Sequence, residues 1–463
     1  MIMRARVGSH LVPCLALGVS VFGSGCVAET QEEEPVGITE QATTSPDAST
    51  FPSTYARQWM TNLSNCIKFD NSHPVVAARQ FSYGAVAIYE SVVNGMPGYR
   101  SLGGQLNGLG ELPKPAAGKT YDWPTVLAQT MHRVALETYV FPLRLFFEFT
   151  TSSEASLGEL GPAQIAYRRL AGVSAKVSED SIAYANQLAD VLVAWINSDG
   201  YKEARFKGWI PPEGPDKWVP TGFSDTDKVV NPEEPWFGLM VRPLVMKSQD
   251  ECRPPGAPAF STDPDSEFYK AAKEVYDTER HLTDEQREIG AFWADVPGAS
   301  ATPPGHWLAL ATKYARPLTL DKAAFGYAQG LLVLHDAAVA VWNEKYSSNI
   351  LRPETYIRRH IDPNWNSQWP SPKFPSYTSG HSGFSGSSAR MLKVAFGENG
   401  PIVDDTKLRR GYGARTFATW DDAAQEAADS RLYGGIHYRF DNEDGLTSGH
   451  CVADKALERV KFH

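Results

Sequence analysis

Apolar residues recur every three or four positions along most of this 463-residue chain, which restricts it to a mainly helical fold. The clearest stripe comprises Ile182, Ala185, Leu188, Leu192, Trp195 and Ile196. The same period predicts helices over 75–93, 126–139, 267–276, 284–293 and 323–342. Alternating patterns with hairpin turns are scarce, and no internal repeat is found. The fold class predicted from the residues is therefore all-α, with helices packed as bundles.

Residues 201–265 depart from this pattern, because they are rich in proline and glycine and carry Trp209, Trp218 and Trp236. Irregular segments of this length in a compact domain are usually functional loops or cover. Elsewhere, 42% hydrophobic residues and twelve tryptophans are ample for a large core. The net charge of −10 argues against nucleic acid or an anionic membrane surface as a general partner.

The N-terminus has the pattern of an export signal over residues 1–25, with Arg4 and Arg6 before an apolar run too short to span a bilayer. The run ends at Gly23-Ser24-Gly25-Cys26, which resembles a bacterial lipobox. Cys26 is therefore expected to be lipidated, with ordinary signal cleavage as the alternative. We expect an exported protein, either an envelope lipoprotein or a periplasmic or extracellular protein, whose only membrane contact is the lipid on Cys26.

The remaining chain divides into three predicted regions. Residues 26–50 are polar and non-periodic, as in a flexible tether. Residues 51–320 form an N-terminal helical region, and residues 321–463 a C-terminal helical region that carries the candidate site. Cys66, Cys252 and Cys451 lack metal-ligand spacing; export permits one disulfide among them, and the pairing stays open.

Three short motifs in the C-terminal region carry the chemistry: Lys345-x6-Arg352-Pro353, Pro375-Ser376-Tyr377-Thr378-Ser379-Gly380-His381, and Ser430-Arg431-x3-Gly434-x-His437-x3-Asp441. Together they supply three cations, two imidazoles, a hydroxyl and a glycine turn. This set of groups suits a tetrahedral or trigonal-bipyramidal oxyanion. The concentration of positive charge is informative because it opposes the net charge of the chain.

Each motif also has a simpler explanation when it stands alone. A helix continued beyond Lys345 would place Arg352 almost above it, around a shared anion or on a solvated basic edge. Ser379 and Gly380 precede a run of small residues that predicts a helix N-terminus, which is either an oxyanion cradle or a plain serine cap. His437 is followed four residues later by Asp441, which can fix its tautomer, whereas a lone histidine is more often structural.

Position for position, the three motifs resemble the signature of the vanadium-dependent haloperoxidase and type 2 acid phosphatase superfamily. Trp293-Ala294-Asp295 and Pro303-Pro304-Gly305-His306-Trp307 also look like segments of secreted bacterial haloperoxidases. The resemblance implies two packed four-helix bundles with long irregular loops. It further implies vanadate held by Lys345, Arg352, Ser379, Gly380 and Arg431, with His437 as the axial ligand. His381 would then be the acid/base residue, and Lys345 would polarise the peroxide.

Two aromatic residues distinguish activities within this superfamily. Trp342 and Phe374 match positions that line the halide pocket of haloperoxidases, although both could equally be core residues. An apolar wall favours a weakly hydrated anion such as iodide. The interval of 50 residues from His381 to Arg431 also looks like that of compact bacterial iodoperoxidases.

The expected function is therefore a vanadate-dependent haloperoxidase that oxidises halide with hydrogen peroxide to hypohalous acid. Iodide is the expected halide, bromide is possible, and a small organic acceptor is possible. The alternatives are a secreted phosphatase that uses His437 as the phosphoryl nucleophile, and a silent phosphate-binding module. The carboxylate partner of Arg431 stays open between Asp295 and Asp336, whereas His306, His335 and His450 are predicted to be structural.

Overall fold

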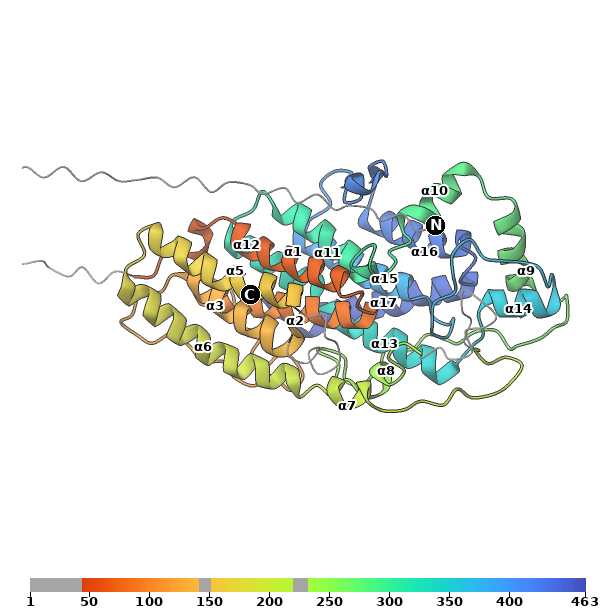
Figure 1. The fold of residues 1–463 in the computed structure, drawn as a ribbon, viewed down its shortest axis with the longest axis horizontal. Coiled ribbons are helices and arrows are strands. Elements are labelled where there is room, and N and C mark those ends of the chain that lie inside the picture. Colours follow the sequence, from red (N-terminus) through yellow and green to blue (C-terminus); the bar gives the residue numbers. More distant parts are fainter. Residues whose placement is uncertain (1–43, 141–150, 220–231) are drawn as a thin grey trace, which may run out of the picture. The chain divides into compact units, whose positions relative to one another are not determined.

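The computed structural model describes residues 44–140, 151–219 and 232–463. The predicted signal, Cys26 and residues 26–43 of the predicted tether lie outside the described residues. Residues 44–463 form one compact unit, and its mainly helical character confirms the predicted fold class (Figure 1). The predicted boundary between the N-terminal and C-terminal helical regions, after residue 320, falls at the first residue of a helix that begins at Leu320. This division into two regions stays a prediction.

The elements of the first half of the chain are as follows. They are η1 (Ala48–Thr50), α1 (Thr54–Phe69), α2 (Pro74–Val92), η2 (Val93–Gly95), α3 (Trp123–Ala135), the π-helical turn η3 (Leu136–Val140), α5 (Thr151–Leu170), α6 (Ala175–Asn197), α7 (Tyr201–Arg205) and α8 (Phe237–Met240). Five of the six residues of the predicted stripe are buried on α6 and Ile182 is half-buried, and Pro74 begins α2 as expected.

The second half carries the site. Its elements are α9 (Glu267–Arg280), α10 (Asp284–Phe292), α11 (Thr302–Ala315), α12 (Leu320–Leu331), α13 (Val333–Ser348), α14 (Pro353–His360), α15 (Gly380–Phe396), β1 (Ile402–Asp404), η4 (Leu408–Arg410), β2 (Arg415–Phe417), α16 (Trp420–Tyr433) and α17 (Arg439–Arg459).

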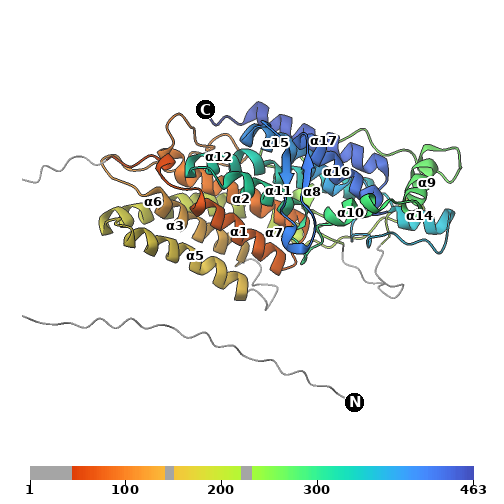
Figure 2. The same cartoon turned by 90° about the horizontal axis from the view of Figure 1, so that it is seen from above.

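The helices pack in two groups. Helices α1, α2, α3 and α5 contact one another, with α6 against α3, while α15 contacts α13, α16 and α17 (Figures 1 and 2). Helices α11 and α12 contact both α2 and α15, and so join the two groups through a shared core. The site motifs all lie in or beside the second group.

The single helix predicted over 323–342 is two helices, α12 and α13, separated at Leu332. The hydroxyl of Ser82 occupies the break: it donates to Leu331 O at 2.8 Å and accepts from His335 N at 2.9 Å. A side chain inserted into the hydrogen-bond ladder interrupts a helix without leaving its backbone groups unpaired. The stretch Leu320–Ser348 is long and apolar enough to cross a bilayer. However, 94% of its most apolar 18-residue segment is buried in the core.

A two-stranded antiparallel sheet was not predicted, since strands of three residues are too short to show alternation. It pairs Ile402 with Phe417 and Asp404 with Arg415. The last residues of the predicted tether also belong to the folded unit: Ala48 is buried, Ser45 Oγ accepts from Tyr121 N, and Pro46 O accepts from Trp123 Nε1.

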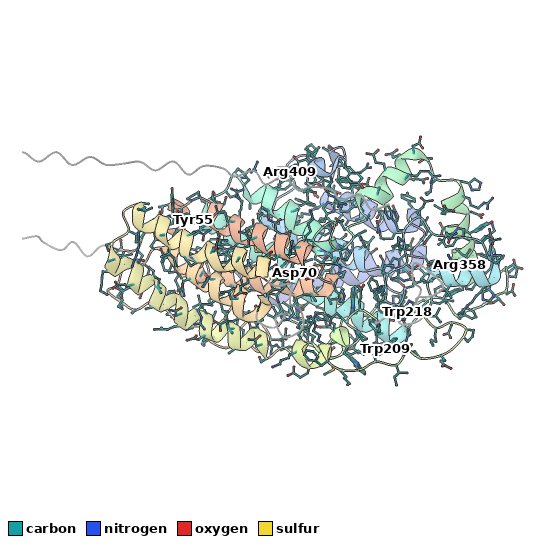
Figure 3. All side chains as sticks on the ribbon, in the orientation of Figure 1. Tyr55, Asp70, Trp209, Trp218, Arg358 and Arg409 are labelled. Carbon is teal, nitrogen blue, oxygen red and sulfur yellow. A yellow bond between two sulfur atoms is a disulfide. The ribbon has the colours of Figure 1, made fainter. Side chains whose placement is uncertain are left out.

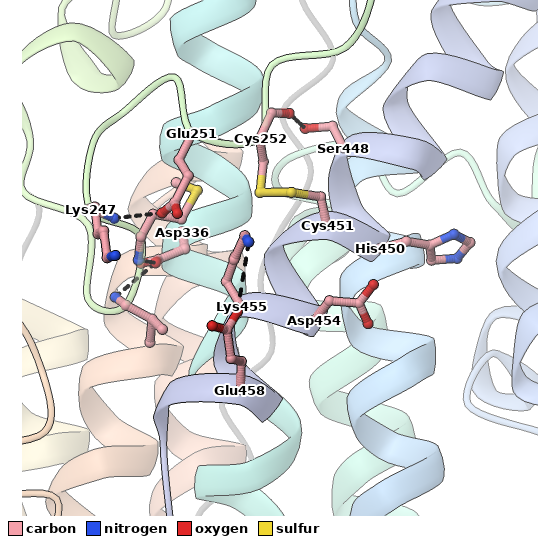
Figure 4. Close-up of a disulfide and its surroundings, with 12 residues drawn as sticks. Lys247, Glu251, Cys252, Asp336, Ser448, His450, Cys451, Asp454, Lys455 and Glu458 are labelled. Carbon is pink, nitrogen blue, oxygen red and sulfur yellow. Dashed lines mark hydrogen bonds and ion pairs between the residues drawn. A yellow bond between two sulfur atoms is a disulfide. The ribbon is translucent and has the colours of Figure 1, made fainter.

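The described part of the irregular segment 201–265 covers the C-terminal end of α13. Trp218 N donates to Asn349 O at 2.8 Å, and the Trp209 ring lies edge-on to Tyr346 at 5.1 Å. Figure 3 labels both tryptophans. The segment also contains the disulfide Cys252–Cys451, which joins it to α17 across 199 residues of sequence (Figure 4). This settles the open cysteine pairing and leaves Cys66 as a buried free thiol.

Candidate active site

The predicted site residues surround a cavity of about 490 Å³. Six of them line it: Trp342, Phe374, Gly380, His381, Arg431 and His437. The other four, Lys345, Arg352, Ser379 and Asp441, are completely buried behind this wall. The three sequence motifs therefore converge on one cavity. The first joins α13 to α14, the second leads into α15, and the third joins α16 to α17.

His437 lies in the turn between α16 and α17, where Gly435 adopts a φ of +72° that disfavours other residues. Its Nδ1 is 2.7 Å from Asp441 Oδ2, and its Nε2 is 3.1 Å from Arg352 Nη1. A guanidinium only donates, so Nε2 must accept and Nδ1 must carry the proton. Burial and the charges of Arg352 and Lys345 hold the pKa of His437 well below its ordinary value. The neutral ring thus keeps its lone pair on Nε2, where it accepts from Arg352.

Asp441 is fixed in turn by two further donors. Ser376 Oγ donates to its Oδ2 at 2.5 Å, and Tyr438 N donates to the same oxygen at 3.2 Å. Burial raises the pKa of this carboxyl, and the Ser376 hydrogen bond and the charge of Lys345 oppose that change. Ser376 belongs to the second motif but was not assigned a role from sequence.

Helix α13 ends at Ser348, so the continued helix that would place Arg352 above Lys345 does not form. Arg352 is instead the N-cap residue of α14. Its side chain nevertheless reaches the site: Nε donates to Phe374 O at 3.0 Å, and Nη1 donates to Ile436 O at 2.8 Å. Nη2 is buried without a hydrogen-bond partner. Burial lowers the pKa of the guanidinium to about 10.

Lys345 lies on the last turn of α13, three residues after Trp342. Its Nζ donates to Pro375 O at 3.0 Å and to Ser376 O at 2.9 Å. Burial, together with the charge of Arg352, lowers its pKa well below the ordinary value for lysine. The ammonium therefore anchors the second motif to α13 while it adds positive charge to the site.

Arg431 donates to Ser430 Oγ at 2.9 Å and to Gly290 O at 3.3 Å. Burial lowers its pKa to about 10, and the charge of Asp295 opposes this. Asp336 is not its partner, because that carboxylate accepts from the backbone N–H groups of Leu244, Val245 and Met246. Of the two carboxylates left open by the sequence, Asp295 is the one that acts on Arg431.

Ser379 is the N-cap of α15, as the simpler sequence interpretation held, since its Oγ accepts from Ser382 N. Its backbone N donates to Asp441 O at 2.9 Å, which ties the second motif to the third. Glycines bring α15 and α17 together: a Cβ on Gly449 would lie 2.4 Å from Gly383 O, and one on Gly445 would lie 2.8 Å from Ser379 O. This close approach places His381 and His437 at the same cavity.

Trp342 and Phe374 form one wall, with ring centroids 5.0 Å apart. The Phe374 ring is also 4.8 Å from Lys345 Nζ and 5.0 Å from the Arg352 guanidinium carbon. Both aromatics are thus buried, as the core interpretation required, and line the cavity, as the halide-pocket interpretation required. The cations behind Phe374 add cation–π stabilisation to this wall.

The donor set fits an oxyanion. Within the described residues, none of Lys345, Arg352 and Arg431 has a carboxylate within ion-pair distance, although all three are buried. Buried cations without counter-ions are costly. An anion on the cavity side of His437 would pair these charges and could accept a hydrogen bond from Arg352 Nη2, which otherwise has no partner.

Comparisons with known proteins identify the family of this chain. A structure described as that of the first bacterial vanadium-dependent iodoperoxidase is 33% identical, with a TM-score of 0.79, over 93% of this chain and 98% of that one. The chain belongs to the vanadium-dependent haloperoxidase family. The resemblance stated from the sequence motifs is thereby confirmed.

Further comparisons place this haloperoxidase within the family fold. Residues 327–463 match the family described as the VCPO second helical-bundle domain. A holo-type bacterial vanadium-dependent chloroperoxidase shares the fold at 15% identity and a TM-score of 0.60, over 83% of this chain and 92% of the other. The apo-type structure of a bacterial vanadium-dependent chloroperoxidase aligns at 13% identity and a TM-score of 0.57, over 84% and 94% of the two chains. No curated protein matches the sequence.

Proposed function

We propose that this haloperoxidase uses vanadate to oxidise halide with hydrogen peroxide to hypohalous acid, and that iodide is its preferred halide. The observation that carries the proposal is the pair Arg352–His437: a neutral imidazole with its Nε2 lone pair fixed, beside a buried guanidinium that lacks a counter-ion. A ligand of the Nε2 nitrogen that is also a polyanion satisfies both groups. Vanadate has that chemistry.

Each predicted site residue then has a defined role toward the bound anion. His437 would supply the nitrogen that holds the anion, and Lys345, Arg352 and Arg431 would neutralise its charge. Ser379 and Gly380 would offer donors at the N-terminus of α15. His381 moves protons at the cavity face. Bound vanadate would supply Lewis acidity that activates peroxide without a change of oxidation state. Asp441 keeps the proton of His437 on Nδ1, away from the anion.

Iodide preference is supported by the wall of Trp342 and Phe374 and by the family relative at 33% identity, which is described as an iodoperoxidase. An apolar aromatic wall offers few hydrogen bonds to replace the hydration of a small anion. Iodide loses the least on leaving water, so it enters at the lowest cost. The cavity of about 490 Å³ also has room for a small organic acceptor beside the halide.

The test begins with protein freed of metal and oxyanions. Orthovanadate is added, and oxidation of iodide, bromide and chloride is measured beside hydrolysis of a chromogenic phosphate ester. Halide oxidation that depends on vanadate supports the proposal. Hydrolysis that vanadate inhibits, without halide oxidation, indicates instead the phosphatase with His437 as nucleophile; phosphate binding without either activity indicates a binding module.

The axial role of His437 is tested by His437→Ala, with His450→Ala on α17 as the matched control. The side chain of His450 is 34% exposed, lies 3.8 Å from Asp421 and does not line the cavity. We expect His437→Ala to abolish halide oxidation while the far-ultraviolet circular dichroism spectrum is retained. Turnover equal to that of the control would remove the axial role.

We also propose export as an envelope lipoprotein anchored through Cys26. The disulfide Cys252–Cys451 supports an oxidising compartment. The test is labelling of producing cells with radioactive palmitate, compared between the native chain and Cys26→Ala. Equal labelling of the two proteins would contradict the anchor.

A further inference from the structure

The peptide carbonyl of Trp293, just beyond α10, accepts a hydrogen bond from the proposed acid/base residue. His381 Nε2 lies 2.9 Å from Trp293 O. A carbonyl oxygen only accepts, so Nε2 must carry a proton. In the neutral ring, which burial and the charge of Arg431 favour by lowering the pKa of His381, the lone pair is left on Nδ1. The position of one peptide group therefore decides which nitrogen of His381 is basic.

That peptide group belongs to segment 292–295, which is held by a buried network of four charged side chains. His306 Nδ1 is 2.8 Å from Asp295 Oδ2, and His306 Nε2 is 2.6 Å from Asp404 Oδ2. Lys407 Nζ is 2.6 Å from Asp295 Oδ1 and also donates to Phe292 O. His306, Asp295, Asp404 and Lys407 are each no more than 4% exposed.

His306 contacts the segment in a second way. Its ring stacks on the Trp293 ring at a centroid distance of 4.3 Å and an interplanar angle of 25°. On its outer side, Trp293 Nε1 donates to Glu426 Oε1 at 2.9 Å. The imidazole of His306 therefore touches both the residue whose carbonyl faces His381 and the carboxylate two positions later.

The charges of the network balance. Burial lowers the pKa of His306, but the charges of Asp295 and Asp404 outweigh burial and raise the pKa above its ordinary value. Burial raises the pKa of Asp295, but the charges of Lys407 and His306 outweigh it and lower the pKa. Two cations thus meet two carboxylates. Asp295 also has a φ of +45°, a conformation that is uncommon for residues other than glycine, although aspartate adopts it more readily than most.

We infer that His306 is a positioning residue: with Asp295, Asp404 and Lys407 it holds the Trp293 carbonyl against His381 and fixes that ring as its Nε2–H tautomer. The catalytic consequence rests on the proposed function, whereas the tautomer is a property of the vanadate-free protein. His306 comes from α11, and Asp404 and Lys407 come from the strand β1 and the turn after it. Of these four residues, only Asp295 lines the cavity.

The test uses two variants of the full chain and one control. His306→Gln keeps an amide that can bond to one carboxylate but removes the charge and the stacked ring. Asp404→Asn removes one charge on the far side of His306 from the cavity. The control is His335→Gln, another buried histidine, which bonds to Arg242 O through Nε2. Circular dichroism identifies the folded proteins, and Asp404→Asn decides the test if His306→Gln does not fold.

The primary readout is the nitrogen NMR spectrum of histidine-labelled, vanadate-free protein. The His381 signals are identified as those missing from the spectrum of His381→Gln. We expect the native chain and His335→Gln to show His381 as the Nε2–H form, and the network variants to show a mixture of both forms. We also expect the kcat for halide oxidation to fall about tenfold or more in those variants with the halide KM unchanged.

An unchanged His381 tautomer in the network variants would overturn the inference, whether or not the kcat falls. A chain that oxidises no halide at all would refute the proposed function. The tautomer measurement would still decide the positioning role in that case, because it requires neither vanadate nor turnover.

Discussion

Asp441 Oδ2 lies 2.7 Å from His437 Nδ1, across the N-terminus of α17, and the same oxygen accepts from Ser376 Oγ and Tyr438 N. One carboxylate oxygen therefore connects the second motif, the third motif and the proposed vanadate ligand. The residues proposed to bind the anion are thus held by Asp441, Ser376 and Tyr438, which do not line the cavity.

Asp441→Asn removes the charge that keeps the proton on His437 Nδ1. Because the outer partner of a ligating histidine sets its basicity and orientation, we expect vanadate affinity to fall about 10–100-fold. Affinity is measured by titrating vanadate into metal-free protein and following the recovery of halide oxidation. The control is Asp454→Asn on the same helix, where the carboxylate is 60% exposed and pairs with Arg390. Equal affinities in the two variants would contradict the role of Asp441.

Phe374→His replaces an apolar wall with a group that can donate hydrogen bonds to a halide. Bromide loses more hydration free energy than iodide when it enters the cavity. A hydrogen-bond donor in the wall therefore offsets more of the cost for bromide than for iodide. We expect the ratio of kcat/KM for bromide to that for iodide to rise about tenfold, or about 1.4 kcal/mol. Phe374→Leu, which stays apolar, is expected to leave the ratio unchanged; a similar rise in both variants would show that ring size, not polarity, sets the preference.

Gly449→Ala tests the contact between α15 and α17. The new Cβ would lie 2.4 Å from Gly383 O, a backbone atom that cannot move without shifting α15. We expect unfolding free energy to fall by about 1–3 kcal/mol, as for other overpacked cores. Gly158→Ala in α5 is the control, since its Cβ would meet nothing within 4 Å. Chemical denaturation of both variants measures the difference, and a Gly449→Ala protein as stable as the control would refute the close contact.

The disulfide Cys252–Cys451 closes a loop of 199 residues. Loss of so long a cross-link increases the freedom of the unfolded chain. We therefore expect Cys252→Ser combined with Cys451→Ser to lower unfolding free energy by about 2–5 kcal/mol. A reducing agent should destabilise the native chain to a similar extent and leave the double variant unaffected. Equal sensitivity of both proteins to reduction would contradict this assignment.

Glu90 gives stability a dependence on pH. Burial raises its pKa from 4.5 to about 7, against hydrogen bonds from Leu102 N and Ser101 Oγ. Between these values the folded chain holds a proton that the unfolded chain has released, so stability falls as pH rises through this range. Glu90→Gln should therefore be less sensitive to pH than the native chain in denaturation measured at about pH 5 and about pH 8. Parallel profiles would exclude Glu90 as the source.

The sequence predicted the features that are local or periodic. The α6 stripe and the pairing of His437 with Asp441 follow from spacing alone. The break at Leu332 does not follow from spacing, because the hydroxyl responsible comes from Ser82 on α2, far away in the sequence. The sequence also did not show how Arg352 reaches the site. A continued helix would have placed it above Lys345, but its side chain comes from the N-terminus of α14.

Other site features depend on contacts between distant segments. Asp404 and Lys407 follow no motif, and they became visible only when the fold placed them against His306. Sequence reasoning treated His306 as structural, and no periodic signal separates it from His335, which is also buried. The segment Trp293-Ala294-Asp295 was noted for its likeness to other haloperoxidases, and that likeness was the available signal.

The unpaired charges of Lys345, Arg352 and Arg431 also bear on how this protein is made and handled. A chain that finishes folding without an oxyanion would hold these like charges close together in its interior, so the proposed ligand would stabilise the native state as well as equip it for catalysis. Inorganic phosphate, at about a hundred times its dissociation constant, would add about 2.7 kcal/mol of stability. A phosphate buffer would therefore protect the purified protein and, by the same contacts, delay its loading with vanadate.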